Sequence, residues 1–309
     1  MKAIMKTGNI VVILWLLSKV LFVLGCGTQK LSGQTPTNQP AMPFKSGYAP
    51  VNGLKMYYEM YGSGRPLVLL HGAFSGINSF AELIPEWSKN RQVIAAEMQG
   101  HVRTADIDRP FSIEAMGKDV IALLEYLKID SADFFGYSMG GEIAFQVAIQ
   151  RPEMVRKLII ASATSNSDGW LPEVHAVYPT ITPELFEGSP PKMDYDRLAP
   201  DPKHWAAFVN KMKEMFVKPF DMLPALVRLP KKPPTFIIIG DSDGIRHEHA
   251  VEMFRLFGGG VVGDFAGLPQ SQLAVLPATT HVGVMMQTEW LRTAVPAFLD
   301  SSSQNPSRH

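Results

Sequence analysis

One hexapeptide, Gly136-Tyr137-Ser138-Met139-Gly140-Gly141, restricts the possible folds of this chain more than any other feature. It matches the pattern G-x-S-x-G and stands between a strand-like run at Asp133–Gly136 and a helix-forming run at Gly140–Gln150. A sharp strand-to-helix turn of this kind is strained, and it needs small residues beside it so that strand and helix can pass closely. The pattern therefore predicts that the Ser138 hydroxyl projects from the carboxyl end of a sheet strand.

Strand-like and helical runs alternate along most of the chain. Strands are expected at Leu54–Tyr61, Pro66–Leu70, Gln92–Glu97, Asp133–Gly136, Lys157–Ala161, Thr235–Gly240 and Leu273–Leu276. Helices are expected from Ser112 onward and at Gly140–Gln150, His249–Phe257 and Thr288–Leu299. The Asn52-Gly53 pair predicts a tight hairpin turn. This alternation favours an α/β fold with a mostly parallel sheet covered on both faces.

The alternation is interrupted between residues 164 and 232, where prolines are frequent and two or three helical stretches replace the strands. Because this region lies between two core strands, we interpret it as a helical cap inserted above the sheet. The folded domain is expected to span residues 48–300, followed by a polar tail at 301–309. The long segment Gly258–Gln272 before the last strand receives no role from the sequence.

A serine nucleophile needs a base that removes its proton, and the base needs a carboxylate that fixes its tautomer. His281 follows the last predicted strand, so it reaches the same sheet edge as Ser138. Two acids follow the strand at Thr235–Gly240. Asp241 closes that strand and suits an Asx-type bond that shapes the turn, whereas Asp243 lies further into the loop. We favour Asp243 as the acid, which gives the chain order Ser, Asp, His.

The loop His71-Gly72-Ala73-Phe74 follows the first parallel strand and reaches the same edge. Its backbone N–H groups can face a developing oxyanion, and the expected donors are the amides of Ala73 and Met139. His71 is expected to order this loop by hydrogen bonds.

From about Tyr48 to about Leu299 the chain resembles the α/β-hydrolase superfamily. The resemblance rests on the hairpin and strand before His71-Gly72, on Gly136–Gly141, on Gly240–Asp243 and on Thr280-His281. Within it, the chain is similar to bacterial aryl esterases and cofactor-free haloperoxidases, which implies a serine nucleophile, an aspartate acid and a histidine base at Ser138, Asp243 and His281. Val102 departs from the family, because relatives usually carry a second glycine in the loop Glu97–Val102.

Acyl-ester hydrolysis through an acyl-enzyme is the activity we expect. A serine at position 138 excludes dehalogenases and epoxide hydrolases, which need a carboxylate there, and Ala73-Phe74 argues against proline iminopeptidases. Some apolar cap residues should line a pocket for a small apolar ester-like substrate; the candidates are Met193, Trp205, Phe208, Met212, Met215, Phe216 and Met222. The alternatives are lactone, C–C bond or thioester hydrolysis or perhydrolysis at the same site, or a non-catalytic surface protein with this fold.

Charge and cysteine content exclude several other classes. The 29 basic and 29 acidic residues cancel, which argues against a nucleic-acid-binding protein. The single cysteine can form neither an intramolecular disulfide nor a cysteine zinc site, and no phosphate-binding loop or H-E-x-x-H motif is present. We therefore expect no cofactor and no metal.

The first 25 residues have the pattern of a signal peptide. Lys2 and Lys6 precede an apolar stretch at Ile10–Gly25, and Cys26 follows it. This arrangement resembles the lipobox of bacterial lipoproteins, in which the cysteine is lipidated and becomes the new N-terminus. Residues 26–47 then form a polar tether. We expect an exported cell-envelope lipoprotein, anchored in a membrane and either periplasmic or on the cell surface.

Replacing Cys26 with serine tests this anchor. The Cys26→Ser variant should be released from membranes or remain unprocessed, because serine offers no thiol for lipidation. Cell fractionation and the mass of the mature chain are the measurements. Identical fractionation of wild type and variant would refute the lipoprotein prediction.

Overall fold

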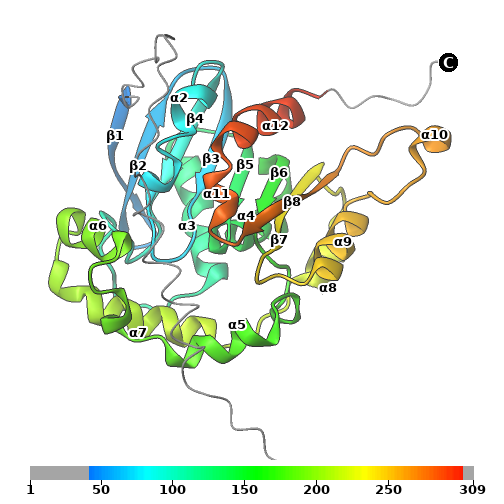
Figure 1. Cartoon of the computed structure of the whole chain (residues 1–309). Coiled ribbons are helices and arrows are strands. Elements are labelled where there is room, and N and C mark those ends of the chain that lie inside the picture. The colour runs from blue at the N-terminus through cyan, green and yellow to red at the C-terminus, as the bar shows by residue number, and fades with distance from the viewer. Residues whose placement is uncertain (1–41, 302–309) are drawn as a thin grey trace, which may run out of the picture.

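The computed structural model describes residues 42–301 (Figure 1). The predicted signal peptide, Cys26, most of the tether at 26–47 and all but the first residue of the tail at 301–309 lie outside this range. Within residues 42–301, no helix has the length and apolarity needed to cross a membrane.

An eight-stranded sheet forms the centre of the described chain. The strands are β1 (Lys45–Val51), β2 (Leu54–Tyr61), β3 (Arg65–Leu70), β4 (Arg91–Ala96), β5 (Ala132–Tyr137), β6 (Val155–Ala161), β7 (Thr235–Ser242) and β8 (Gln272–Thr280). Their order across the sheet is β1-β2-β4-β3-β5-β6-β7-β8. The pairs β1/β2 and β2/β4 are antiparallel and every other pair is parallel, so the predicted mostly parallel sheet is confirmed.

Helices cover both faces of the sheet (Figure 1). The core helices are α2 (Ile84–Trp87), α3 (Ile113–Tyr126), α4 (Met139–Gln150), α9 (His247–Leu256), α11 (Gly283–Met286) and α12 (Thr288–Asp300), with 3₁₀ helices at Ile77–Phe80 and Pro152–Met154. The apolar sides of α3, α4 and α9 pack in one core cluster, and those of α2 and α12 pack in another. Ser112 caps α3 by accepting a hydrogen bond from the Ala115 N–H.

Both edges of the sheet differ from the sequence prediction. The β1–β2 hairpin turns at Asn52 and Gly53, both at positive φ, but β1 already begins at Lys45, inside the expected tether. Lys45 and Ser46 are exposed and lack the apolar alternation of a strand, so only backbone pairing with β2 reveals them. Strand β8 extends to Thr280 rather than Leu276, because an edge strand tolerates Pro277 and exposed side chains.

Residues 164–232 form the predicted helical cap, which lies below the sheet in Figure 1. Its helices are α5 (Pro172–Val177), α6 (Pro190–Leu198), α7 (Trp205–Phe216) and α8 (Leu223–Val227), with 3₁₀ helices at Ser167–Gly169, Tyr178–Thr180, Pro183–Phe186 and Pro202–His204. Of the candidate pocket residues, Trp205, Phe208, Met212 and Met222 are buried, Met193 is 62% exposed, and Met215 and Phe216 are partly buried.

The segment Gly258–Gln272 extends away from the body of the protein and carries the short helix α10 (Gly263–Ala266) (Figure 1). Phe265 and Leu268 are about nine-tenths exposed on it.

Lys211 links the cap to the loop that follows β4 by an ion pair and two hydrogen bonds. Its ammonium group lies 2.6 Å from Asp106 Oδ2 and donates hydrogen bonds to the carbonyl oxygens of Ile107 and Arg109. The Asp106 side chain is 6% exposed, so this carboxylate depends on its protein partners.

The variant Lys211→Met should lower the free energy of unfolding by about 1–3 kcal/mol, because it leaves Asp106 without its cation. Denaturant unfolding measures the change. Lys213→Met on the same helix is the control and should stay within about 0.5 kcal/mol of wild type. Equal losses of unfolding free energy in the two variants would show that the Lys211 contacts do not stabilise the cap.

Candidate active site

Ser138 lies at a strained turn between β5 and α4. Its backbone has φ 52° and ψ −122°, a region that non-glycine residues rarely occupy. A Cβ atom at Gly136 would lie 2.3 Å from the Gly140 carbonyl oxygen, and one at Gly140 would lie 2.0 Å from the Leu70 carbonyl oxygen. Only glycine fits at these two positions, and the close packing holds the serine at the carboxyl edge of the sheet.

His281 reaches Ser138 from the end of β8. Its Nε2 atom lies 3.0 Å from Ser138 Oγ, and its Nδ1 atom lies 2.8 Å from Asp243 Oδ1. The histidine side chain is 28% exposed, so solvent reaches the site. The structure thus brings the three sequence-predicted residues together.

Ser162 is a partner of Asp243 that the sequence analysis missed. Its hydroxyl donates to Asp243 Oδ2 at 2.6 Å, directly after the end of β6. Burial raises the pKa of Asp243, but the hydrogen bonds from His281 and Ser162 outweigh burial and hold the pKa below its ordinary value. Its position after a core strand at the carboxyl edge was the signal that could have identified Ser162.

Asp241 has a different role. Its carboxylate accepts hydrogen bonds from the N–H groups of Ala278 at 2.8 Å and Thr279 at 3.1 Å, and these bonds lower its pKa. Ala278 has φ 51°, so Asp241 stabilises an irregular part of β8. The sequence predicted a local turn bond, whereas the bonds cross to the neighbouring strand.

The loop after β3 lies directly against the serine. A Cβ atom at Gly72 would be 3.4 Å from Ser138 Cβ. Among the described hydrogen bonds, none is donated by the N–H groups of Ala73 or Met139. Two uncommitted N–H groups beside a nucleophile can stabilise an oxyanion.

His71 and Glu97 order the two neighbouring loops that follow β3 and β4. His71 is fully buried, and its Nε2 accepts a hydrogen bond from the Met98 N–H at 3.1 Å, so its proton lies on Nδ1, 2.8 Å from the Gly72 oxygen. Burial lowers the pKa of His71 to about 4, so it stays neutral. Glu97 accepts a hydrogen bond from the Arg103 N–H at 2.7 Å. This contact closes the loop around Val102, which adopts φ 46° despite its branched Cβ.

Aromatic side chains surround the histidine and the loop. The rings of Trp170 and Tyr137 lie 5.5 Å and 5.4 Å from the His281 ring. The Phe74 ring packs against two rings of the cap: its centroid lies 4.6 Å from that of Phe186 and 5.9 Å from that of Phe216.

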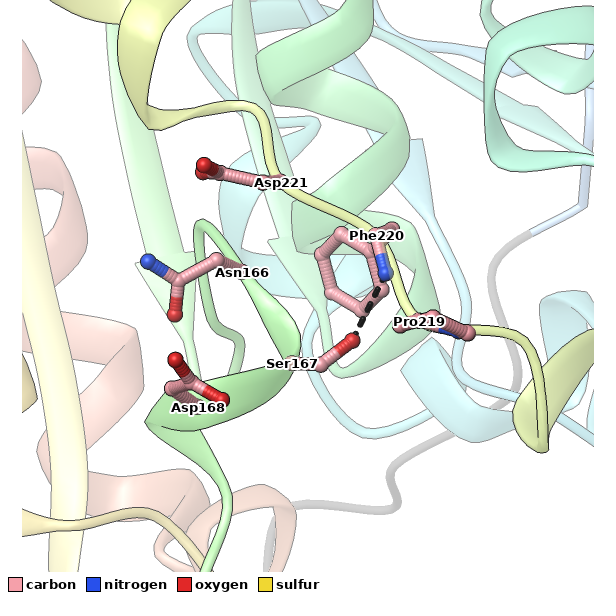
Figure 2. A pocket seen from close by; sticks show the side chains of 6 residues that line it. All are labelled: Asn166, Ser167, Asp168, Pro219, Phe220 and Asp221. Carbon is pink, nitrogen blue, oxygen red and sulfur yellow. Dashed lines mark hydrogen bonds between the residues drawn. The ribbon is translucent and has the colours of Figure 1, made fainter.

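A separate cavity of about 320 Å³ lies between the 3₁₀ helix at Ser167–Gly169 and the loop that joins α7 to α8 (Figure 2). It is lined by Asn166, Ser167, Asp168, Pro219, Phe220 and Asp221. The Ser167 hydroxyl accepts a hydrogen bond from the Phe220 N–H at 2.7 Å, and the Ser167 N–H donates to the Phe220 oxygen at 2.9 Å. The segment that enters the cap is thereby joined to the loop between α7 and α8. Ser138, His281 and Asp243 do not line this cavity. In residues 42–301, no cluster of three or more His, Cys, Asp or Glu residues is arranged to hold a metal ion.

Comparison with known proteins shows similarity in sequence and fold to hydrolases. The sequence profile described as alpha/beta hydrolase fold matches residues 65–226. A 2-hydroxymuconate semialdehyde hydrolase from Pseudomonas sp. (strain CF600) is 32% identical over 119 residues, which are 37% of this chain and 42% of that protein. The matched segments span between 42% and 60% of the first five curated relatives.

Two solved structures share the fold at low sequence identity. The enol-lactonase from Burkholderia xenovorans LB400 has a TM-score of 0.62 and 20% identity, covering 82% of this chain and 100% of that one. The thermophilic esterase from Thermogutta terrifontis has a TM-score of 0.61 and 22% identity, covering 84% and 98%.

The two aspartates should respond very differently to amidation. Asp243→Asn should lower kcat for an activated ester on the order of 10⁴-fold, because an amide neither fixes the His281 tautomer nor stabilises its charged form. Asp241→Asn should cost far less, because the amide oxygen still accepts one of the two β8 hydrogen bonds. Steady-state kinetics should follow a check of thermal stability. A larger loss of kcat in Asp241→Asn than in Asp243→Asn would make Asp241 the acid of the triad. If neither variant lost activity, the acid would be a different residue.

Proposed function

Because the chain belongs to the α/β-hydrolase family, we propose that it is a serine hydrolase that cleaves carboxylic esters through an acyl-enzyme intermediate. The hydrogen-bonded series Ser138–His281–Asp243 carries the proposal. Such a series turns a weakly nucleophilic hydroxyl into an attacking group, and the same arrangement serves acyl transfer on unrelated folds.

In the first half-reaction, Ser138 Oγ attacks the ester carbonyl carbon while its proton passes to His281 Nε2. The N–H groups of Ala73 and Met139 stabilise the tetrahedral oxyanion, each by about 3 kcal/mol. Asp243 orients the imidazole through Nδ1 and stabilises its charged form. The C–O bond to the alcohol then breaks, and His281 returns the proton to the departing alcohol oxygen.

In the second half-reaction, water attacks the acyl carbon of the acyl-enzyme. His281 accepts one water proton and later gives it to Ser138 Oγ as the bond to the serine breaks. The products are the carboxylic acid and the free enzyme, so no external oxidant, reductant or metal enters the balance.

The same residues serve a second candidate, hydrolysis of a lactone or a C–C bond. The relatives named for 2-hydroxymuconate semialdehyde and enol-lactone hydrolysis favour this candidate. We also propose that the substrate is small and apolar, which the aromatic side chains of Phe74 and Phe216 support, and that a lipid at Cys26 anchors the enzyme to a membrane.

A substrate panel tests the activity. Short acyl and aryl p-nitrophenyl esters should be hydrolysed faster than lactones and amino-acyl amides, and Ser138→Ala should abolish turnover on all of them. Initial rates with purified protein give kcat/KM for each compound. A preference for lactones would favour the second candidate. A preference for amides, or undiminished turnover by Ser138→Ala, would overturn the proposal.

A further inference from the structure

One buried carboxyl beside the triad has no part in the mechanism above. Glu142 lies in the first turn of α4, four residues after Ser138, and is 7% exposed. No Lys, Arg or His pairs with it among the salt bridges of residues 42–301. An uncompensated buried carboxyl is costly, so its presence calls for a specific purpose.

Glu142 is held by neutral donors. The Thr164 hydroxyl lies 3.3 Å from Glu142 Oε1. The Trp170 side chain lies close enough to act as a second donor that favours the charged carboxylate. Burial raises the pKa of Glu142 to about 8, although both donors act in the opposite direction. Burial raises the pKa of Tyr178 of the cap, and the nearby Glu142 charge raises it further.

Trp170 connects this carboxyl group to the triad. Its ring lies 5.5 Å from the His281 ring, and its backbone pairs with Ile245. The next residue, Leu171, donates its N–H to the Gly244 oxygen at 2.8 Å, directly after the triad acid Asp243. The tryptophan therefore contacts the base with its ring, the acid loop with its backbone and Glu142 with its side chain.

We propose that Glu142 is a positioning residue for the catalytic base: its carboxyl group fixes the Trp170 side chain, and the Trp170 ring confines His281 to the orientation that bridges Ser138 and Asp243. This inference rests on the proposed function of the triad. The base needs such support because His281 follows an edge strand and is partly exposed. A misplacement of about 1 Å in a catalytic group can cost up to 10²-fold in rate.

The experiment measures the reactivity of Ser138 directly, through its rate of labelling by a fluorophosphonate probe, together with kcat and KM for the best ester. Glu142→Leu and Trp170→Phe should each lower the labelling rate and kcat about tenfold, with KM within about twofold, because the reacting group is displaced and not the substrate. Glu142→Gln should remain within about threefold of wild type, since its amide oxygen still accepts the hydrogen bond. Glu173→Leu removes an exposed cap carboxylate near Trp170 and should change nothing.

The double variant Glu142→Leu/Trp170→Phe provides the decisive comparison. It should be no slower than either single variant, because both changes break the same connection. Multiplied losses, a loss confined to KM, or wild-type labelling of Glu142→Leu would each overturn the inference. If Glu142→Leu does not fold, Trp170→Phe alone must still show the kcat loss.

The labelling assay also separates this inference from the proposed function. Labelling that depends on Glu142 without ester turnover would refute the esterase and support the positioning role. A wild-type protein that the probe does not label would overturn both.

Discussion

The strained backbone at Ser138 is the constraint on which the rest of the structure depends. Its positive φ costs about 1–3 kcal/mol, and this cost persists only where the surroundings allow no alternative. The close approaches at Gly136 and Gly140, together with the Ser138 N–H that donates to the Ala161 oxygen at 2.8 Å, remove the alternatives. The serine is therefore positioned by backbone packing before any side chain of the site contributes.

Parallel topology explains why the fold, and the meeting of Ser138, His281 and Asp243, could be predicted from the sequence. Every parallel strand delivers the residue that follows it to one edge, so a residue that follows a predicted strand acquires a known location. Ser138, His281 and Asp243 each follow a strand closely enough for that rule to apply. The choice between Asp241 and Asp243 needed only the observation that one closes the strand and the other lies in the loop.

The features that the sequence did not predict depend on long-range packing. Ser162 follows a predicted strand, so its place at the sheet edge could be predicted, but its bond to a residue 81 positions away could not. Trp170 meets His281 across more than 100 positions. Neither contact leaves a local periodicity. The cap shows the same limit: its apolar residues have helical spacing whether they face the core, as Phe208 does, or solvent, as Met193 does. The start of β1 at Lys45 was missed because backbone pairing alone defines that end of the strand.

Two buried carboxyl groups near the nucleophile show how the structure distributes charge. Asp243 is 4% exposed and Glu142 is 7% exposed, yet the pKa of Asp243 is lowered and that of Glu142 is raised. Desolvation acts in the same direction on both, so the partners make the difference. Asp243 accepts from an imidazole that can carry positive charge, whereas the hydrogen-bond donors near Glu142 within residues 42–301 are a neutral alcohol and a neutral indole. Negative charge is thereby concentrated behind the imidazole, where, in the proposed mechanism, it stabilises the positive charge that develops when His281 takes the serine proton.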